Sequence, residues 1–220
     1  MIYTIGGIKG GSGKTTLAVT IAVMLSKKGR KALLVDADKQ ATATDFSQWR
    51  TESLGQTGFT SIQLADIQVR NEVLKMKADY DDVIIDAGGR DTASQRAALV
   101  VSDVLLTPFA PKSFDIWTLE QVSELITEMQ VANPGLKAYA VLNKVDYNQK
   151  DQSEAKAYIE ESGVMQVLHN CLHERKAIAN AAASGLAVTE YKPRNPKAIL
   201  EVEALVDEII SLQDQNSKAA

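Results

Sequence analysis

The feature that most constrains the fold is a glycine-rich turn between a short apolar run and a longer amphipathic one. Residues 9–16 read Lys-Gly-Gly-Ser-Gly-Lys-Thr-Thr; the run Ile2–Ile8 precedes them, and the helix-like run Lys14–Lys28 overlaps their end. A turn of this kind points backbone N–H groups and the positive end of the helix dipole at one place. We therefore predict a cradle for phosphate groups. The alternative is a solvated glycine turn that precedes a helix.

Short apolar runs alternate with helix-like runs along the rest of the chain. Runs such as Asp82–Asp86 are apolar at consecutive positions, which is typical of strands buried on both faces. We predict an α/β fold with a mostly parallel sheet of about seven strands and helices on both faces. A single domain is expected over residues 1–220, with residues 213–220 frayed. The expected strands are Ile2–Ile8, Lys31–Val35, Phe59–Leu64, Asp82–Asp86, Val104–Phe109, Ala138–Asn143 and Met165–His169. The expected helices are Lys14–Lys28, Ala41–Glu52, Ile67–Lys77, Thr92–Val101, Ile116–Val131, Gln152–Glu161, Glu174–Ala183 and Pro196–Leu212.

Polar residues follow several of these strands, where ligands of parallel sheets bind. Gly13-Lys14-Thr15 predicts that Lys14 contacts the β- and γ-phosphates of a nucleotide and that the Thr15 hydroxyl binds Mg²⁺. Asp36 and Asp38 follow the second strand, and one carboxylate can orient the attacking water while the other supports the metal. The alternative is that this pair only caps the next helix. The predicted nucleotide-binding residues are Gly10, Gly11, Ser12, Gly13, Lys14, Thr15, Thr16 and Asn143.

The fourth expected strand ends in Ile-Ile-Asp86-Ala-Gly88-Gly89. An apolar strand that ends in aspartate is typical of a Walker B motif, so we expect Asp86 to hold Mg²⁺ through water. Gly88 and Gly89 would form a switch loop that senses the γ-phosphate.

Taken together, these motifs resemble the ParA/MinD family of ATPases over nearly the whole chain. Ile8 stands where the ordinary P-loop has glycine, and the loop opens with a second lysine, Lys9, as in the family's deviant Walker A motif. The resemblance implies that Lys9 reaches across a homodimer to the partner's nucleotide. It also implies that Asp38 is the hydrolytic aspartate and Asp36 the one on the metal side, although Lys39 replaces the family's proline. The stretch 108–115 is a looser match to a family motif that ends in aspartate. Its last residue, Asp115, could equally cap the helix that follows it.

The sixth strand is followed by Asn143-Lys-Val-Asp146, and here the interpretation divides. Asn-Lys-x-Asp is the guanine-binding motif of GTPases, whereas ParA-like ATPases often keep an asparagine that pairs with adenine. Because the other motifs are those of the ATPase branch, we expect ATP. A GTPase that acts as a metallochaperone or targeting factor is the alternative, and a synthase-like enzyme with a second small-molecule substrate is less favoured. If the nucleotide is ATP, Asp146 is expected only to cap a following turn.

Relatives of this type position plasmids, chromosomes or protein assemblies, bind non-specific DNA or membrane as ATP dimers, and are released when a small partner protein stimulates hydrolysis. The net charge of −4 is uneven: residues 173–197 carry five basic and two acidic side chains, whereas residues 198–220 carry one and five. We therefore expect DNA rather than membrane, since the last helix is too acidic for a MinD-type membrane anchor. The candidate DNA-binding residues are Arg175, Lys176, Lys192, Arg194 and Lys197.

The single cysteine, Cys171, excludes an intrachain disulfide and the cysteine clusters of the nitrogenase-reductase and tail-anchor-targeting branches. The beginning of the sequence has no signal-peptide pattern, so a cytoplasmic, nucleoid-associated protein is expected.

Overall fold

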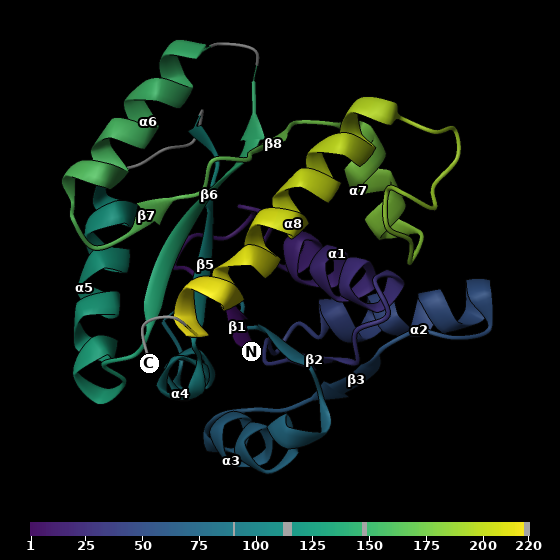
Figure 1. Ribbon diagram of the computed structural model, residues 1–220, viewed down its shortest axis with the longest axis horizontal. Coiled ribbons are helices and arrows are strands. Elements are labelled where there is room, and N and C mark those ends of the chain that lie inside the picture. The colour runs from purple at the N-terminus through teal and green to yellow at the C-terminus, as the bar shows by residue number, and fades with distance from the viewer. Residues whose placement is uncertain (90, 112–115, 147–148, 218–220) are drawn as a thin grey trace.

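The protein folds around one parallel sheet, seen in a computed structural model that describes residues 1–89, 91–111, 116–146 and 149–217 (Figure 1). The strands run in the order β3-β2-β4-β1-β5-β6-β7, and β8 pairs with β6 beyond the end of β7. Every strand pair is parallel. The strands are β1 (Ile2–Ile5), β2 (Ala32–Asp36), β3 (Thr60–Gln63), β4 (Asp82–Asp86), β5 (Val104–Phe109), β6 (Lys137–Val145), β7 (Gln166–Val167) and β8 (Leu172–His173).

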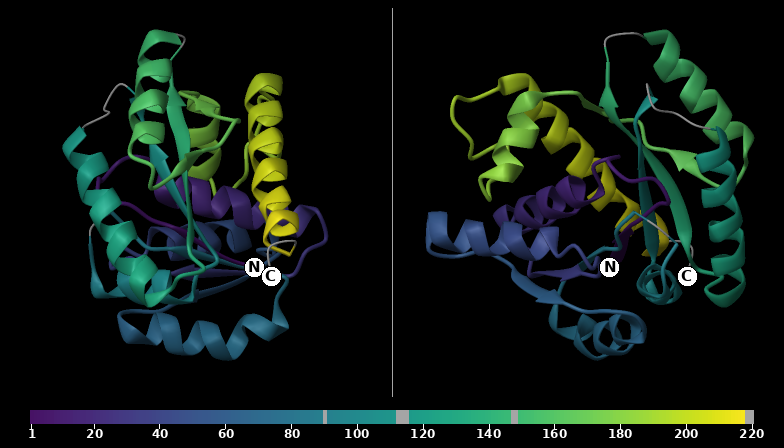
Figure 2. Two further views of the ribbon diagram at one scale, coloured as in Figure 1. Left: turned by 60° about the vertical axis from the view of Figure 1, so that its left-hand side comes forward. Right: turned by 180° about the vertical axis from the view of Figure 1, so that it is seen from behind.

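Helices cover both faces of the sheet, as expected. They are α1 (Lys14–Lys27), α2 (Thr42–Leu54), α3 (Ile67–Met76), α4 (Ala93–Val101), α5 (Ile116–Ala132), α6 (Gln149–Glu161), α7 (Lys176–Ala183) and α8 (Pro196–Ser217), with a 3₁₀ turn, η1 (Lys77–Asp79), after α3. On one face α1, α2, α7 and α8 pack against alternate strand residues such as Tyr3 and Ile5. On the other face α3 and α4 pack on β2 and β4, and α5 and α6 pack on β5 and β6 (Figure 2).

The prediction of burial on both faces is confirmed for β1, β2, β4 and β5, in which every residue is buried. It is not met by the edge strand β3, whose residues are exposed or intermediate. The seventh strand is shorter than expected, and β8 follows it after a short break. No strand was predicted at β8, since two residues carry no periodicity of their own. None of the helices in the described ranges is long and apolar enough to cross a bilayer.

Residues 213–217, for which the sequence predicts fraying, continue α8 to Ser217. The side-chain amide of Gln213 donates to Tyr3 Oη at 3.0 Å and to Asp82 Oδ1 at 2.6 Å, and its oxygen accepts from Arg30 Nη2 at 2.9 Å. This partly buried network ties Gln213 of α8 to β1 and β4. The final residues, 218–220, lie outside the described residues, as does Asp115.

Candidate nucleotide-binding site

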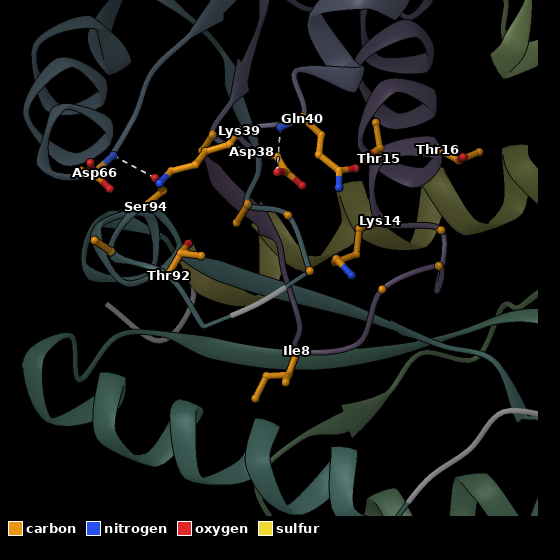
Figure 3. Close-up of a pocket in the computed structure, with 18 of the residues that line it drawn as sticks. Ile8, Lys14, Thr15, Thr16, Asp38, Lys39, Gln40, Asp66, Thr92 and Ser94 are labelled. Atoms are coloured by element: carbon orange, nitrogen blue, oxygen red, sulfur yellow. Dashed lines mark hydrogen bonds between the residues drawn. The ribbon is translucent and has the colours of Figure 1, made fainter.

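The carboxyl ends of β1, β2 and β4 meet at one edge of the sheet, and a cavity of about 920 Å³ opens there (Figure 3). Its lining combines the glycine-rich turn with the loops that follow β2 and β4, so residues far apart in the sequence share one site. Lys14, from the start of α1, and Asp38, from the loop after β2, both line this space (Figure 3). The lining includes Gly10, Gly11, Gly13, Lys14, Thr15, Thr16, Asp38, Gly88, Gly89 and Lys144.

Lys14 is the best-enclosed cation of the site, with 6% of its surface exposed. Its ammonium donates to the backbone oxygen of Lys9 at 2.5 Å, within the turn itself. Burial lowers the pKa of Lys14, and the negative charges of Asp86 and Asp38 oppose that shift. A buried cation beside two carboxylates is well placed to neutralise phosphate oxygens.

Asp86 is fully buried at the end of β4, and neither carboxylate oxygen makes a hydrogen bond of ordinary geometry within the described residues. Burial raises its pKa from 3.8 to about 7; the nearby Thr15 hydroxyl opposes this shift, while Asp36 and Asp38 add to it. An unsatisfied buried carboxylate is costly unless a cation satisfies it. Asp86 and Thr15 thus present the oxygen ligands that Mg²⁺ prefers, and the residues fit this ion.

Asp36 is also buried, but its oxygens are occupied. Oδ2 accepts from the backbone N–H and the hydroxyl of Thr44, both at 2.8 Å, and Oδ1 accepts from the N–H of Asp38 at 3.2 Å. Burial raises the pKa of Asp36, and the Thr44 hydrogen bonds partly offset the rise. The structure therefore shows Asp36 holding the first turn of α2, as the capping alternative anticipated. A metal-side role for Asp36 stays a prediction.

Asp38 differs from Asp36 because it lies at the cavity surface. Its Oδ1 accepts from the N–H of Gln40 at 3.1 Å, and its other oxygen lies against Gly88 (Figure 3). Gly89 approaches the phosphate loop, since a Cβ there would lie 3.2 Å from Lys14 Nζ and 3.4 Å from Gly10 Cα. The expected switch loop thus lies against Lys14, which we expect to bind phosphate, and Asp38, which we expect to orient the attacking water.

Asn143 lies under the phosphate loop, and its side chain is used by the protein. Its Nδ2 donates to Ser12 O at 2.7 Å, and its Oδ1 accepts from the N–H of Lys144 at 2.9 Å. The contact is so close that a Cβ at Gly13 would overlap the Asn143 amide. Asn143 therefore braces the loop in this structure, and its pairing with a base stays a prediction.

Two further residues brace the same loop and were not singled out from the sequence. Lys144 Nζ donates to Gly11 O at 2.7 Å, and the buried Gln95 on α4 accepts from the N–H of Gly7 at 3.0 Å. Lys144 stood inside the Asn-Lys-x-Asp motif, so a signal was available. Gln95 had none, because nothing in an isolated helix distinguishes a glutamine that faces a loop from one in solvent.

The predicted DNA-binding residues do not form one uniform set. Lys176, Lys192, Arg194 and Lys197 are exposed. Arg175 instead pairs with Glu201 of α8, its Nε lying 2.9 Å from Oε2, and its side chain is only 12% exposed. Because an acidic residue of α8 neutralises Arg175, the surface cations are the other four.

The strand order and the loop-to-helix turn at Lys14 together define a P-loop nucleotide-binding protein. A family model described as the CobQ/CobB/MinD/ParA nucleotide binding domain matches residues 3–188, and the chain belongs to this family. The resemblance drawn from the motifs is confirmed.

Individual relatives cover nearly the whole chain. A "maintenance of carboxysome distribution protein A" of Halothiobacillus neapolitanus is 28% identical over 208 residues, covering 94% of each chain. Among solved structures, an ATP complex of Cyanothece McdA has a TM-score of 0.77 at 17% identity and covers 94% of this chain and 95% of that one. The cell division ATPase MinD of Pyrococcus furiosus has a TM-score of 0.72 at 22% identity, covering 96% and 98%. The fold is therefore that of ParA/MinD-type ATPases.

Proposed function

We propose that the protein is an ATP-dependent switch that homodimerises on ATP, binds non-specific DNA and positions a cargo, and is reset when a partner protein stimulates hydrolysis. The observation that carries this proposal is the fully buried Asp86, whose oxygens lack an ordinary hydrogen bond within the described residues, close to a cavity that Lys14, Thr15 and Asp38 line. In this proposal the metal and the triphosphate bind next to Asp38, whose carboxylate lies at the cavity surface and would orient the water.

Each residue has a separate task in this proposal. Lys14 and the loop N–H groups bind the phosphates, Thr15 and Asp86 hold Mg²⁺, and Asp38 orients the attacking water. Bound Mg²⁺ would supply charge neutralisation of the triphosphate. Lys9 lies on the exposed part of the loop, where it can reach the nucleotide of a second copy.

DNA is proposed as the surface because four exposed cations lie along α7, the α7–α8 connection and the start of α8. The connection consists of residues 184–195. Two such sets on a dimer would neutralise phosphates without reading sequence. A membrane is less suitable, because most of the large apolar residues of α8 face the core: Val202, Leu205, Val206, Ile209 and Leu212 are buried, whereas Leu200 is exposed. The expectation that this stripe is core packing is confirmed.

The cargo class is suggested by the relatives. Two of them are named for carboxysome distribution and one is a ParA protein, so a large protein assembly and a plasmid or chromosome are both candidates.

The test is retention on random-sequence duplex DNA with ATP, ADP or GTP at two salt concentrations. ATP alone should produce retention, which added salt should weaken. The Asp38→Ala variant, which should bind ATP without hydrolysing it, is expected to remain on DNA longer. Retention and hydrolysis with GTP rather than ATP would instead support the GTPase alternative suggested by Asn143 and Asp146.

A further inference from the structure

Two adjacent residues of the α7–α8 connection, Thr189 and Glu190, are held by two helices that both begin at the nucleotide site. From the end of α1, Lys27 Nζ donates to Thr189 Oγ1 at 2.9 Å. From the middle of α2, Arg50 binds Glu190 through two parallel hydrogen bonds of 2.7 and 2.9 Å. Figure 1 shows the connection lying over the C-terminal end of α1.

Additional hydrogen bonds from both side chains restrain the Arg50–Glu190 ion pair. The Arg50 side chain is 7% exposed, and it also donates to Thr57 O at 2.7 Å and to Gly185 O at 3.2 Å. Glu190 accepts in addition from the N–H of Ala187 at 3.0 Å. An ion pair with a buried arginine, a partly buried glutamate and two parallel hydrogen bonds resists separation, because parting the charges leaves the arginine unpaired in the interior.

Backbone packing reinforces the contact. A Cβ on Gly185 would lie 2.6 Å from the backbone nitrogen of Arg50, so the connection rests directly on the backbone of α2. Any rotation or shift of α2 must therefore displace the connection as well, since close-packed elements transmit displacement.

The other end of α2 is attached to the nucleotide site. Thr44, in its first turn, makes both of its hydrogen bonds to Asp36, and Asp36 lies in register with Asp86 on the neighbouring strand. Thr44 and Arg50 are six positions apart on one helix, about 9 Å along its axis. A single rigid helix thus joins the loop that carries Asp38 to the connection that carries Lys192 and Arg194.

We propose that Arg50 and Glu190 are positioning residues that couple nucleotide binding to the basic surface. When ATP and the metal engage the loop after β2, α2 moves the connection through this ion pair and places Lys192 and Arg194 for DNA. This inference rests on the proposed function. Since coupling between two sites is reciprocal, DNA must tighten ATP binding by the factor by which ATP tightens DNA binding.

The test uses the double variant Arg50→Met/Glu190→Leu, which removes both charges and leaves neither buried alone. Its matched control, Lys28→Gln/Asp207→Asn, removes an ion pair between the residue that follows α1 and α8, and neither residue belongs to the connection. For each protein, the affinity for a fluorescent ATP analogue is measured with and without random-sequence duplex DNA, after thermal unfolding has shown that it is folded. If the double variant does not fold, Glu190→Gln takes its place, because it keeps the side-chain size and removes one charge.

We expect the unaltered protein and the control to show the same coupling factor. The double variant should keep its ATP affinity without DNA within about twofold, while its coupling factor falls about threefold or more towards 1, the value at which the two ligands bind independently. A folded variant with an unchanged coupling factor overturns the inference alone. Absence of ATP-dependent DNA binding by the unaltered protein overturns the proposed function, and the inference with it.

Discussion

Asp38 lies directly against Gly88: a Cβ on this glycine would be 2.6 Å from Asp38 Oδ2 and 2.8 Å from its carboxylate carbon. The aspartate that we assign to the attacking water and the loop that we assign to γ-phosphate sensing are therefore in contact before any nucleotide is considered. No larger residue can occupy position 88 unless Asp38 moves.

Gly88→Ala should consequently impair hydrolysis more than binding. The methyl group would displace the Asp38 carboxylate, whereas Lys14 and Thr15 would keep their positions. We expect ATP turnover to fall about tenfold or more, with the affinity for ATP changed by less than about threefold. Steady-state phosphate release and nucleotide titration measure the two effects.

The control for this variant is Gly163→Ala. Gly163 has a similar backbone angle, φ +67° against +75° at Gly88, but nothing lies within 4 Å of its added Cβ. Both variants should lose about 1 kcal/mol of stability through backbone strain, and only Gly88→Ala should lose turnover. Equal turnover in the two variants would contradict the contact-based explanation.

Asp86→Asn should change how stability depends on pH. The folded protein raises the pKa of Asp86 to about 7, so it favours the protonated carboxyl group. This contribution to stability is fully present below the ordinary pKa near 4 and is lost as pH rises through about 7. Asparagine resembles the protonated form at every pH. The nucleotide-free variant should therefore exceed the unaltered protein in free energy of unfolding by about 2–4 kcal/mol at pH 8, and not at pH 4.

Denaturant unfolding at both pH values, without nucleotide or Mg²⁺, measures this difference. With Mg²⁺ and ATP the order should reverse at pH 8, because only the ionised Asp86 stabilises the bound cation. Parallel pH profiles for the two proteins would be inconsistent with a raised pKa at this position.

Lys9→Ala should abolish ATP-dependent dimers without preventing nucleotide binding by the monomer. Lys14 bonds the backbone oxygen of Lys9, not its side chain, so the substitution leaves that contact in place. Light scattering with ATP, at a protein concentration where the unaltered chain is dimeric, reports the association. Dimers of Lys9→Ala as stable as those of the unaltered protein would refute the crossing role.

The basic residues should separate into two groups. Changing Lys192 to Ala should reduce the slope of log affinity for DNA against log salt concentration by about 1 per protomer. Changing Arg175 to Ala should leave this slope nearly unchanged and instead lower the melting temperature, because Arg175 is paired with Glu201. Salt titrations of DNA binding, together with thermal unfolding of both variants, make the comparison.

Much of the site could be predicted from the sequence because its signals are local. The strand, the glycine-rich turn and Lys14 lie within a short stretch. Asp86 ends one apolar strand, and Asp38 lies shortly after another. Parallel strands necessarily bring such positions to one edge of the sheet. The bracing residues Gln95 and Lys144 could not be placed in the same way, since their partners lie 88 and 133 positions away in the sequence.

Only the tertiary structure decides which charged side chains are paired with a residue of another element. Asp36 and Asp38 are two positions apart with the same chemistry, yet Thr44 occupies the first and the cavity surrounds the second. Arg175 and Lys176 are neighbours, yet α8 neutralises only Arg175. Backbone geometry follows from nearby residues and so can be inferred from their order. The partner of a charge depends on which distant element packs beside it, and that becomes definite only when the core has formed.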